Sequence, residues 1–343
     1  MNQIQRRATI GDVAKEADVS TATVSRVINK TGPVAPQTVE RVLAAIKRLD
    51  YVPHSGARQM AGGRPNLIGL IFPGIGDPFL TDLLRGIENY LLEEGYELLL
   101  YCPQEHSSEE RHRFLPLNEH NTDGLIVYAE SLSENELRRF YSLNFPLVLL
   151  HQTPPAGMDI PCVTMENKHG AGQAVAHLIA CGRRRIAFLA GPDGNEDSYW
   201  RELGYRETLA VHGIPFRPEL IACGGFSAEM AETAVAQWLA DGVNPDAIFA
   251  ADDNSAQGAI FALQQAGKRV PEDVAVVGFD DVNSARYLTP PLTTVRTPIR
   301  EAGRKAAEQL IRLLRGETAD SLTLLPTELV IRESCGSHLT RPK

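Results

Sequence analysis

The sequence predicts an α/β protein in which a small all-helical N-terminal unit precedes two doubly wound parallel-sheet lobes. Residues 1–52 carry three short apolar stripes at helical spacing. From residue 67 onward, near-continuous apolar strands alternate with amphipathic helices, a pattern typical of parallel sheets that are covered on both faces. Roughly ten such strands are too many for one compact sheet, so two lobes are expected.

Composition excludes several classes of protein. The chain has 343 residues, of which 43% are hydrophobic and 22% are charged, as in globular proteins. No uncharged apolar run is long enough for a transmembrane helix, and the N-terminus lacks the apolar segment of a secretory signal. We therefore expect a cytoplasmic protein. The five cysteines are scattered without a CxxC pair, which favours reduced thiols over disulfides or zinc: Cys102, Cys162, Cys181, Cys223 and Cys335.

Charge divides the chain unevenly. Residues 1–64 contain ten Lys or Arg against five acids, a charge of +5. The remainder of the chain carries −14, which gives the net charge of −9. A basic N-terminal unit on an acidic body indicates that only this unit meets a polyanion.

The N-terminal unit is expected to form three helices. Thr9, with Asp12 three residues later, predicts a capping box at the start of the first. Ser20 is expected to cap the second helix, at about 21–29, after a turn at Asp18. The third should follow Pro36 with four residues facing inward: Val39, Leu43, Ile46 and Leu49.

The second helix has two different faces. Val24, Val27 and Ile28 are expected to point inward. The outward side chains are then small or polar: Thr21, Ala22, Ser25 and Arg26. Two helices joined by three or four residues, with the second short and polar outside, predict a DNA-binding helix-turn-helix. The alternative is a generic three-helix bundle.

Residues 53–64, PHSGARQMAGGR, are expected to be a linker. They could form a short helix, but glycines at 56, 62 and 63 make it marginal on its own, since each interior Gly costs about 0.5–1 kcal/mol against Ala. The segment is therefore expected to fold only when something stabilises it.

The larger region is expected to cross between its lobes near 151–164 and 281–292. Lobe 1 is predicted at about 65–160 and 293–320, and lobe 2 at about 161–292 and 321–335. The predicted strands are the apolar runs at 67–72, 96–101, 124–128, 146–150, 185–190, 247–251 and 274–279.

Motifs for cofactor chemistry are missing. The segment 74–79, GIGDPF, begins like a dinucleotide motif, but Phe79 stands in place of the third glycine. No P-loop, zinc-protease or serine-hydrolase motif occurs, and the histidines lack metal-ligand spacing. We expect no cofactor, no metal and no enzyme activity.

Two acidic pairs, Asp252–Asp253 and Asp280–Asp281, follow predicted strands, where α/β sheets bind ligands. These carboxylates could bond ligand hydroxyls, act in acid–base catalysis, or cap the next helices. Capping fits Asp253 and Asp281 well.

Several segments closely resemble the lactose-repressor (LacI/GalR) family. They include TIGDVAKEADVSTATVSRVIN (9–29), VAPQTVERVLAAIKRLDYVP (34–53), ARQMAGG (57–63), NKHGAGQAVAHLIACGRRRIAFLAG (167–191), VAVVGFDD (274–281) and PPLTTVRTP (290–298). The resemblance covers nearly the whole chain. It implies a helix-turn-helix domain at 1–52, a hinge helix at 53–64, and an effector-binding and dimerisation core at 65–343 that resembles periplasmic sugar-binding proteins.

The resemblance also implies roles for individual residues. Thr21, Ala22 and Arg26 fall on positions that read bases, and Ala57 and Met60 on the hinge that enters the minor groove. Ser20, Thr23, Ser25 and Asn29 would bond phosphates. Asp18 stands where the family commonly has Gly. The effector positions fall in the core: Asp77, Phe79, His151, Arg201, Phe226, Asp252 and Asp280.

The expected partners are a double-stranded DNA operator with palindromic symmetry, a sugar-like effector, and a second copy of the chain. The C-terminal tail carries no heptad repeat, so a dimer is expected rather than a tail-mediated tetramer. Three alternatives are a periplasmic sugar-binding protein, an enzyme, and a DNA-binding protein without an effector.

Overall fold

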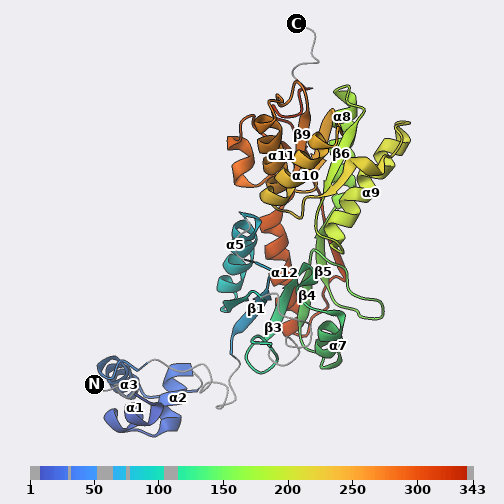
Figure 1. Ribbon diagram of the computed structural model, residues 1–343. Helices are drawn as coiled ribbons and strands as arrows, with labels where there is room; N and C mark the ends of the chain where they lie inside the picture. The colour runs from blue at the N-terminus through green and yellow to red at the C-terminus, as the bar shows by residue number, and fades with distance from the viewer. Residues whose placement is uncertain (1–7, 30–31, 52–64, 75–77, 104–114, 338–343) are drawn as a thin grey trace. The chain divides into compact units, whose positions relative to one another are not determined.

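The computed structural model describes residues 8–29, 32–51, 65–74, 78–103 and 115–337 (Figure 1). The chain divides into two units, Met1–Asn66 and Leu67–Lys343, and each has its own core. The predicted hinge at 53–64 lies outside the described residues.

The N-terminal unit consists of α1 (Ile10–Glu16), α2 (Thr21–Asn29) and α3 (Pro36–Arg48). The capping box is confirmed, since Thr9 Oγ1 accepts from the Asp12 amide at 3.3 Å and Asp12 Oδ2 from the Thr9 amide at 2.8 Å. Ser20 caps α2 through a bond from the Thr23 amide at 3.1 Å. Local side-chain chemistry therefore starts both helices.

The core of this unit differs from the prediction at one position. Val13, Val24, Val42 and Ala45 are fully buried. Leu43, predicted to face inward, is 54% exposed. Ile46 and Leu49 pack against this core as predicted, but Val42 and Ala45, three residues apart, form its fully buried row, and Leu43 points outward.

The turn between α1 and α2 tolerates Asp18. This residue has φ +52°, in the left-handed region that favours glycine. Aspartate is among the few other residues that adopt it readily. The family's usual glycine is therefore replaced without loss of the turn.

We expect Thr9→Ala to lower the stability of the N-terminal unit by about 1 kcal/mol, since it removes the cap on α1. The expected result is a lower urea midpoint for the helical signal of this unit. Replacement of Thr9 by Ser keeps the hydroxyl and should restore the midpoint. An equal loss for Ser and Ala would contradict a capping role.

Lobe 1 is a six-stranded sheet in the order β11–β5–β4–β3–β1–β2, and all its pairings are parallel. Helices α5 (Pro78–Glu93) and α12 (Ile299–Leu314) cover one face, and α7 (Glu134–Ser142) covers the other. The strands are β1 (Leu67–Ile71), β2 (Glu97–Tyr101), β3 (Gly124–Tyr128), β4 (Leu147–Leu150), β5 (Cys162–Met165) and β11 (Leu322–Leu325).

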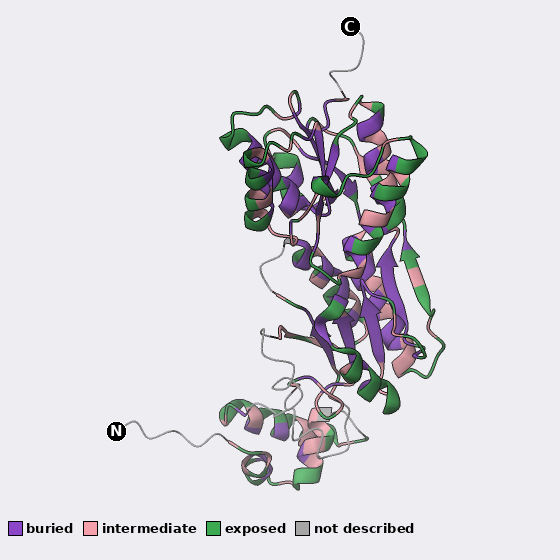
Figure 2. Cartoon of the chain, turned by 45° about the vertical axis from the view of Figure 1, so that its right-hand side comes forward, coloured by how far each residue is buried: buried purple, intermediate pink, exposed green. Residues whose placement is uncertain are grey.

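Lobe 2 is a second six-stranded sheet in the order β12–β10–β9–β8–β6–β7, parallel except where β12 pairs with β10. One face packs against α8 (Asn167–Ala180) and α9 (Glu196–Val211), the other against α10 (Ala228–Ala240) and α11 (Asp253–Gln265). Both sheets are largely buried between helices whose outer faces are exposed (Figure 2). The strands are β6 (Ile186–Ala190), β7 (Ile221–Cys223), β8 (Ala247–Ala250), β9 (Ala275–Asp280), β10 (Thr293–Arg296) and β12 (Glu328–Val330).

The chain crosses between the lobes one strand later than predicted. The crossings fall after β5, after β10 and after β11, rather than at the predicted boundaries 160, 292 and 320. The Pro- and Gly-rich segment at 154–161 is a loop inside lobe 1, because β5 still pairs with β4 and β11. The composition identified the loops correctly, but it did not show which sheet the next strand joins.

Within the described residues, no helix is long and apolar enough to cross a membrane.

Candidate functional site

The outward face of α2 is exposed and polar. Thr21, Ala22 and Arg26 are exposed, while Val24 on the opposite side is fully buried. Thr23 and Ser25 are half-buried beside this face. Asn29 is the last residue of α2, and Ala57 and Met60 lie outside the described residues. The face thus presents one long cation among small hydrogen-bonding side chains.

Arg201, on α9, lies at the centre of the cleft between the two lobes and is only 2% exposed. Its Nε donates to Asn167 Oδ1 at 2.8 Å, and Nη1 donates to the Ala251 carbonyl at 2.5 Å. Nη2 lies 3.3 Å from Asp280 Oδ1 and 3.7 Å from Asp197 Oδ2. A buried guanidinium requires such partners, so Arg201 is a fixed cation and not a surface ion pair.

His151 joins the lobes from the end of β4. Its Nδ1 is 2.6 Å from Asp197 Oδ2 on α9, and the ring centroid is 5.2 Å from that of Phe79 and 5.0 Å from that of Tyr128. His151 is 1% exposed, and its Nε2 has no hydrogen-bond partner among the described residues. Burial opposes ionisation of Asp197, but His151, Arg201 and Asn167 together lower its pKa. Asp197 is therefore a charged link between the lobes.

Two further contacts join the first turn of α9 to lobe 1. Glu196 Oε2 accepts from the Thr153 amide at 2.7 Å, and Glu130 Oε1 accepts from the Glu196 amide at 3.1 Å. Together with the His151–Asp197 pair, these bonds must be broken or rearranged whenever the lobes change their angle.

The carboxylates at the ends of β8 and β9 have separate tasks. Asp252 is the cap of α11, since its oxygens accept from the Asn254 and Ser255 amides, both at 3.1 Å. The expectation that Asp253 caps this helix was wrong, because Asp253 is already inside it and points into the lobe. Asp281 is likewise no cap, since it pairs with Arg296 and Arg332.

Asp253 is fully enclosed. Its Oδ1 accepts from Thr294 Oγ1 at 2.5 Å and its Oδ2 from the Val282 amide at 2.9 Å. Burial, together with the charges of Asp280 and Asp252, raises the pKa of Asp253 well above its usual value, against the two hydrogen bonds. The carboxyl is therefore held toward its neutral form.

A raised folded-state pKa means that folding takes up a proton, so Asp253 costs stability once the pH exceeds its unfolded pKa. The cost grows as pH rises toward the folded pKa, by about 1.4 kcal/mol for each pKa unit. We expect Asp253→Asn, which mimics the neutral acid, to raise the melting temperature at pH 8 more than at pH 5. Asp273→Asn, at an exposed ion pair with Arg269, is the control. A pH-independent effect of Asp253→Asn would contradict the shifted pKa.

The cleft residues surround a small cavity of about 30 Å³. Its wall is formed by Phe79, Tyr128, Arg201, Phe226, Asp252, Asp253, Asn254, Asp280 and Val282. A cavity of this volume holds a water molecule, whereas small-molecule sites measure about 300–1,000 Å³. A sugar therefore requires the lobes to move apart, or their contacts to rearrange, before it can enter.

The structure brings together most of the predicted effector residues. Phe79, Arg201, Phe226, Asp252 and Asp280 line one cavity, and His151 packs beside Phe79. Asp77 lies outside the described residues.

Sequence reasoning missed three residues of this cleft, Asp197, Tyr128 and Asn167. Asp197 could have been found from its i,i+4 spacing to Arg201 on one helix. Tyr128 ends a predicted strand, a position where α/β sheets bind ligands. Asn167 begins the segment 167–191 that resembles the family, but its bond to Arg201 depends on how α8 packs against α9. In the described ranges, no cluster of three or more His, Cys, Asp or Glu residues is suited to a metal ion.

Comparison with known proteins gives matches to two family models. Residues 9–54 match the model "Bacterial regulatory proteins, lacI family", and residues 175–335 match "Periplasmic binding protein-like domain". The chain is 36% identical to the ribose operon repressor of Halalkalibacterium halodurans, over 95% of this chain and 96% of that protein. This chain belongs to the lacI family of bacterial regulatory proteins.

Solved structures agree with this assignment. The lac repressor dimer bound to operator and the anti-inducer ONPF has a TM-score of 0.82 and 29% identity, with 96% of this chain and 99% of that chain covered. The complex of the transcriptional regulator CelR with cellobiose has a TM-score of 0.72 and 33% identity, over 96% and 100%. The expected fold class, a helix-turn-helix unit before two parallel-sheet lobes, is confirmed. The family consists of transcriptional regulators rather than enzymes.

Proposed function

We propose that this lacI-family protein is a transcriptional repressor that binds a palindromic operator as a homodimer, with its affinity controlled by a sugar-like effector in the interlobe cleft. The observation that carries the proposal is the exposed face of α2, where Arg26 stands beside Thr21 and Ala22 on a helix whose opposite side carries the fully buried Val24. Such a helix fits the major groove of DNA.

The family resemblance supplies the positions of the DNA contacts, and side-chain chemistry indicates the kind of contact at each. Arg26 suits a bidentate bond to guanine, and Thr21 and Ala22 suit a thymine methyl or one hydroxyl bond. Ser20, Thr23, Ser25 and Asn29 would bond phosphates, and Ala57 and Met60 would enter the minor groove. One such head buries little surface, so a dimer on two half-sites supplies the remaining affinity. The operator-bound lac repressor dimer supports this arrangement.

A polyhydroxyl effector fits the cleft. Fixed charges at Arg201, Asp252 and Asp280 offer donors and acceptors, and Phe79 and Phe226 offer faces on which a sugar can stack. The cellobiose complex of CelR supports a sugar as the ligand class. We place the protein in the cytoplasm, on the nucleoid, where its operator lies.

Effector and operator are coupled through the lobes. Entry of a sugar rearranges the bonds of His151, Thr153 and Glu130 to α9, and so changes the angle between the lobes. The segments at 53–64 of the two copies then move together or apart, and fold or fray in the minor groove. A coupling free energy of about 1–3 kcal/mol changes operator affinity 5–150-fold, and the operator must change effector affinity by the same factor.

The test is a gel-retardation assay in which the purified full chain selects palindromic fragments from a random pool at low ionic strength. Selection should converge on a symmetric site, and one member of a sugar panel should shift the affinity. Failure to select any symmetric site would overturn the proposal. A selected site with no response to any sugar would favour the second candidate, an effector-independent regulator.

A further inference from the structure

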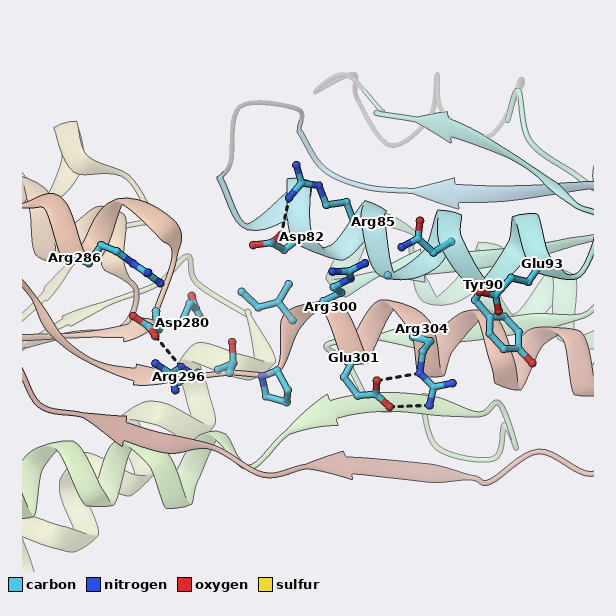
Figure 3. A pocket seen from close by; sticks show the side chains of 16 residues that line it. Asp82, Arg85, Tyr90, Glu93, Asp280, Arg286, Arg296, Arg300, Glu301 and Arg304 are labelled. Atoms are coloured by element: carbon cyan, nitrogen blue, oxygen red, sulfur yellow. Dashed lines mark hydrogen bonds and ion pairs between the residues drawn. The ribbon is translucent and has the colours of Figure 1, made fainter.

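A second cavity, of about 760 Å³, lies at the junction of the two lobes and is separate from the proposed effector site. It is bounded by α5 and α12 of lobe 1 and by the segments around β9 and β10 of lobe 2. Figure 3 shows five arginine side chains around it: Arg85, Arg286, Arg296, Arg300 and Arg304. Its volume suits a small metabolite.

Two of these arginines carry charges that no carboxylate neutralises. Arg296 pairs with Asp281 at 2.8 Å, and Arg304 pairs with Glu301 through two bonds of 2.9 Å. Arg286 and Arg300, in contrast, are exposed and form no ion pair with any described residue. They converge on the cavity from different lobes, so an anion between them would be bound from both sides.

A buried hydroxyl in the same cavity also lacks a partner. Thr297 is 5% exposed, and its Oγ1 has no hydrogen-bond partner within the described residues. An unsatisfied buried polar group costs free energy and is uncommon in native proteins. Thr297 lines the cavity, and rotation of its side chain about χ1 turns the hydroxyl toward a ligand there.

The N-terminus of α12 adds a third element. This helix of 16 residues begins at Ile299, and its cap, Pro298, offers no side-chain bond to the first amides. The Ile299 amide donates to the Thr297 carbonyl at 2.9 Å, so the next amides of the first turn and the helix dipole are what favour an anion at this end. Gly86 of α5 allows the close approach, because a Cβ there would overlap the Arg300 carbonyl. The packing of α5 on α12 therefore fixes the place of Arg300.

The remaining wall matches an organic group with hydroxyls. Asn89, Tyr90 and Glu93 of α5 also line the cavity, and Figure 3 shows Tyr90 and Glu93 beyond Arg300. Their amide, phenol and carboxylate can donate to and accept from sugar hydroxyls. We propose that this junction cavity binds a phosphorylated sugar-like metabolite, with the phosphate held by Arg286, Arg300, Thr297 and the N-terminus of α12.

Asp280 connects this site to the cleft. Its side chain lines both cavities and pairs with Arg201 at 3.3 Å. Residues 297 and 298 also form one of the crossings between the lobes. A ligand at the junction therefore acts on the lobe angle and on Arg201, and should change the affinity of the cleft for its effector. This coupling rests on the proposed function, whereas binding of the phosphate does not.

The test is calorimetry of the full chain with four probes: ribose 5-phosphate, inorganic phosphate, ribose and citrate. Ribose 5-phosphate should bind more tightly than inorganic phosphate. The double variant Arg286→Gln, Arg300→Gln should weaken the binding of ribose 5-phosphate and of inorganic phosphate by about tenfold or more, since it removes two charge-assisted bonds. Arg138→Gln, at an exposed arginine on α7, is the control and should change nothing.

The variant Phe226→Ala tests whether the phosphate binds in the effector cleft instead. Unchanged ribose 5-phosphate binding in this variant supports the junction site, whereas loss of that binding overturns the proposal. The inference is also overturned if no phosphate binds at millimolar concentrations, if the double variant binds normally, or if citrate binds as tightly as ribose 5-phosphate. Operator retardation on the same preparation separates the two proposals, because its failure with intact phosphate binding affects only the repressor function.

Discussion

Replacement of Arg201 by alanine is expected to abolish the response to the effector and to destabilise the core by about 3–5 kcal/mol. The guanidinium bonds Asn167 and the Ala251 carbonyl and pairs with Asp280 and Asp197, so its loss leaves buried carboxylates without their counter-charge. The urea midpoint measures the loss of stability. Operator retardation with and without the effector measures the response to the effector, under conditions where the variant is folded.

The matched control is Arg206→Ala, one turn further along α9, where the arginine is half exposed and pairs with Glu202. Exposed pairs contribute about 0–1 kcal/mol, so this variant should remain inducible and nearly as stable as the parent. Arg201→Lys keeps the charge but loses the fixed planar geometry, and should bind the effector weakly. Normal induction in Arg201→Ala would remove Arg201 from the proposed site, whatever its effect on stability.

Arg26→Ala is expected to weaken binding to the operator by about 1–3 kcal/mol, while binding to random DNA changes much less. The reason is that Arg26 lies on the exposed face of α2, where a bidentate contact reads one base. Competition titrations at fixed salt, with operator and random duplexes, measure the specificity ratio.

Arg41→Ala is the control for charge, because this exposed arginine of α3 lies in the same unit. Its loss should weaken binding to both duplexes equally and leave the specificity ratio unchanged. If Arg26→Ala weakened operator and random DNA by the same factor, Arg26 would be a phosphate contact and not a base reader.

The elements with local signals were predictable from the sequence. The capping box at Thr9, the cap at Ser20 and the seven apolar strands all depend on neighbouring residues, and the structure contains each of them. Strands β5, β7, β10, β11 and β12 are only three or four residues long, and most of them mix polar with apolar residues, so no clear apolar run marks them. Leu43 was misplaced because two stripes overlap on α3.

The composition of the cleft was partly predictable. Residues that the family resemblance assigned to the effector, such as Arg201 and Asp280, do lie together. The residue that caps α11 could not be predicted, because either Asp252 or Asp253 could begin that helix. The partners Asn167 and Asp197 depend on how α8, α9 and β4 meet, and these elements are brought together by the lobes and not by local sequence.

The three crossings also determine the order in which the molecule can be completed during synthesis. Lobe 1 lacks an edge strand until residues 322–325 have been translated, and lobe 2 lacks one until 328–330 have followed. The N-terminal unit, in contrast, is complete within the first fifty residues or so. A nonsense codon before position 322 should therefore yield an intact DNA-contacting head attached to two unfinished sheets, a product that chaperones and proteases would remove from the cell.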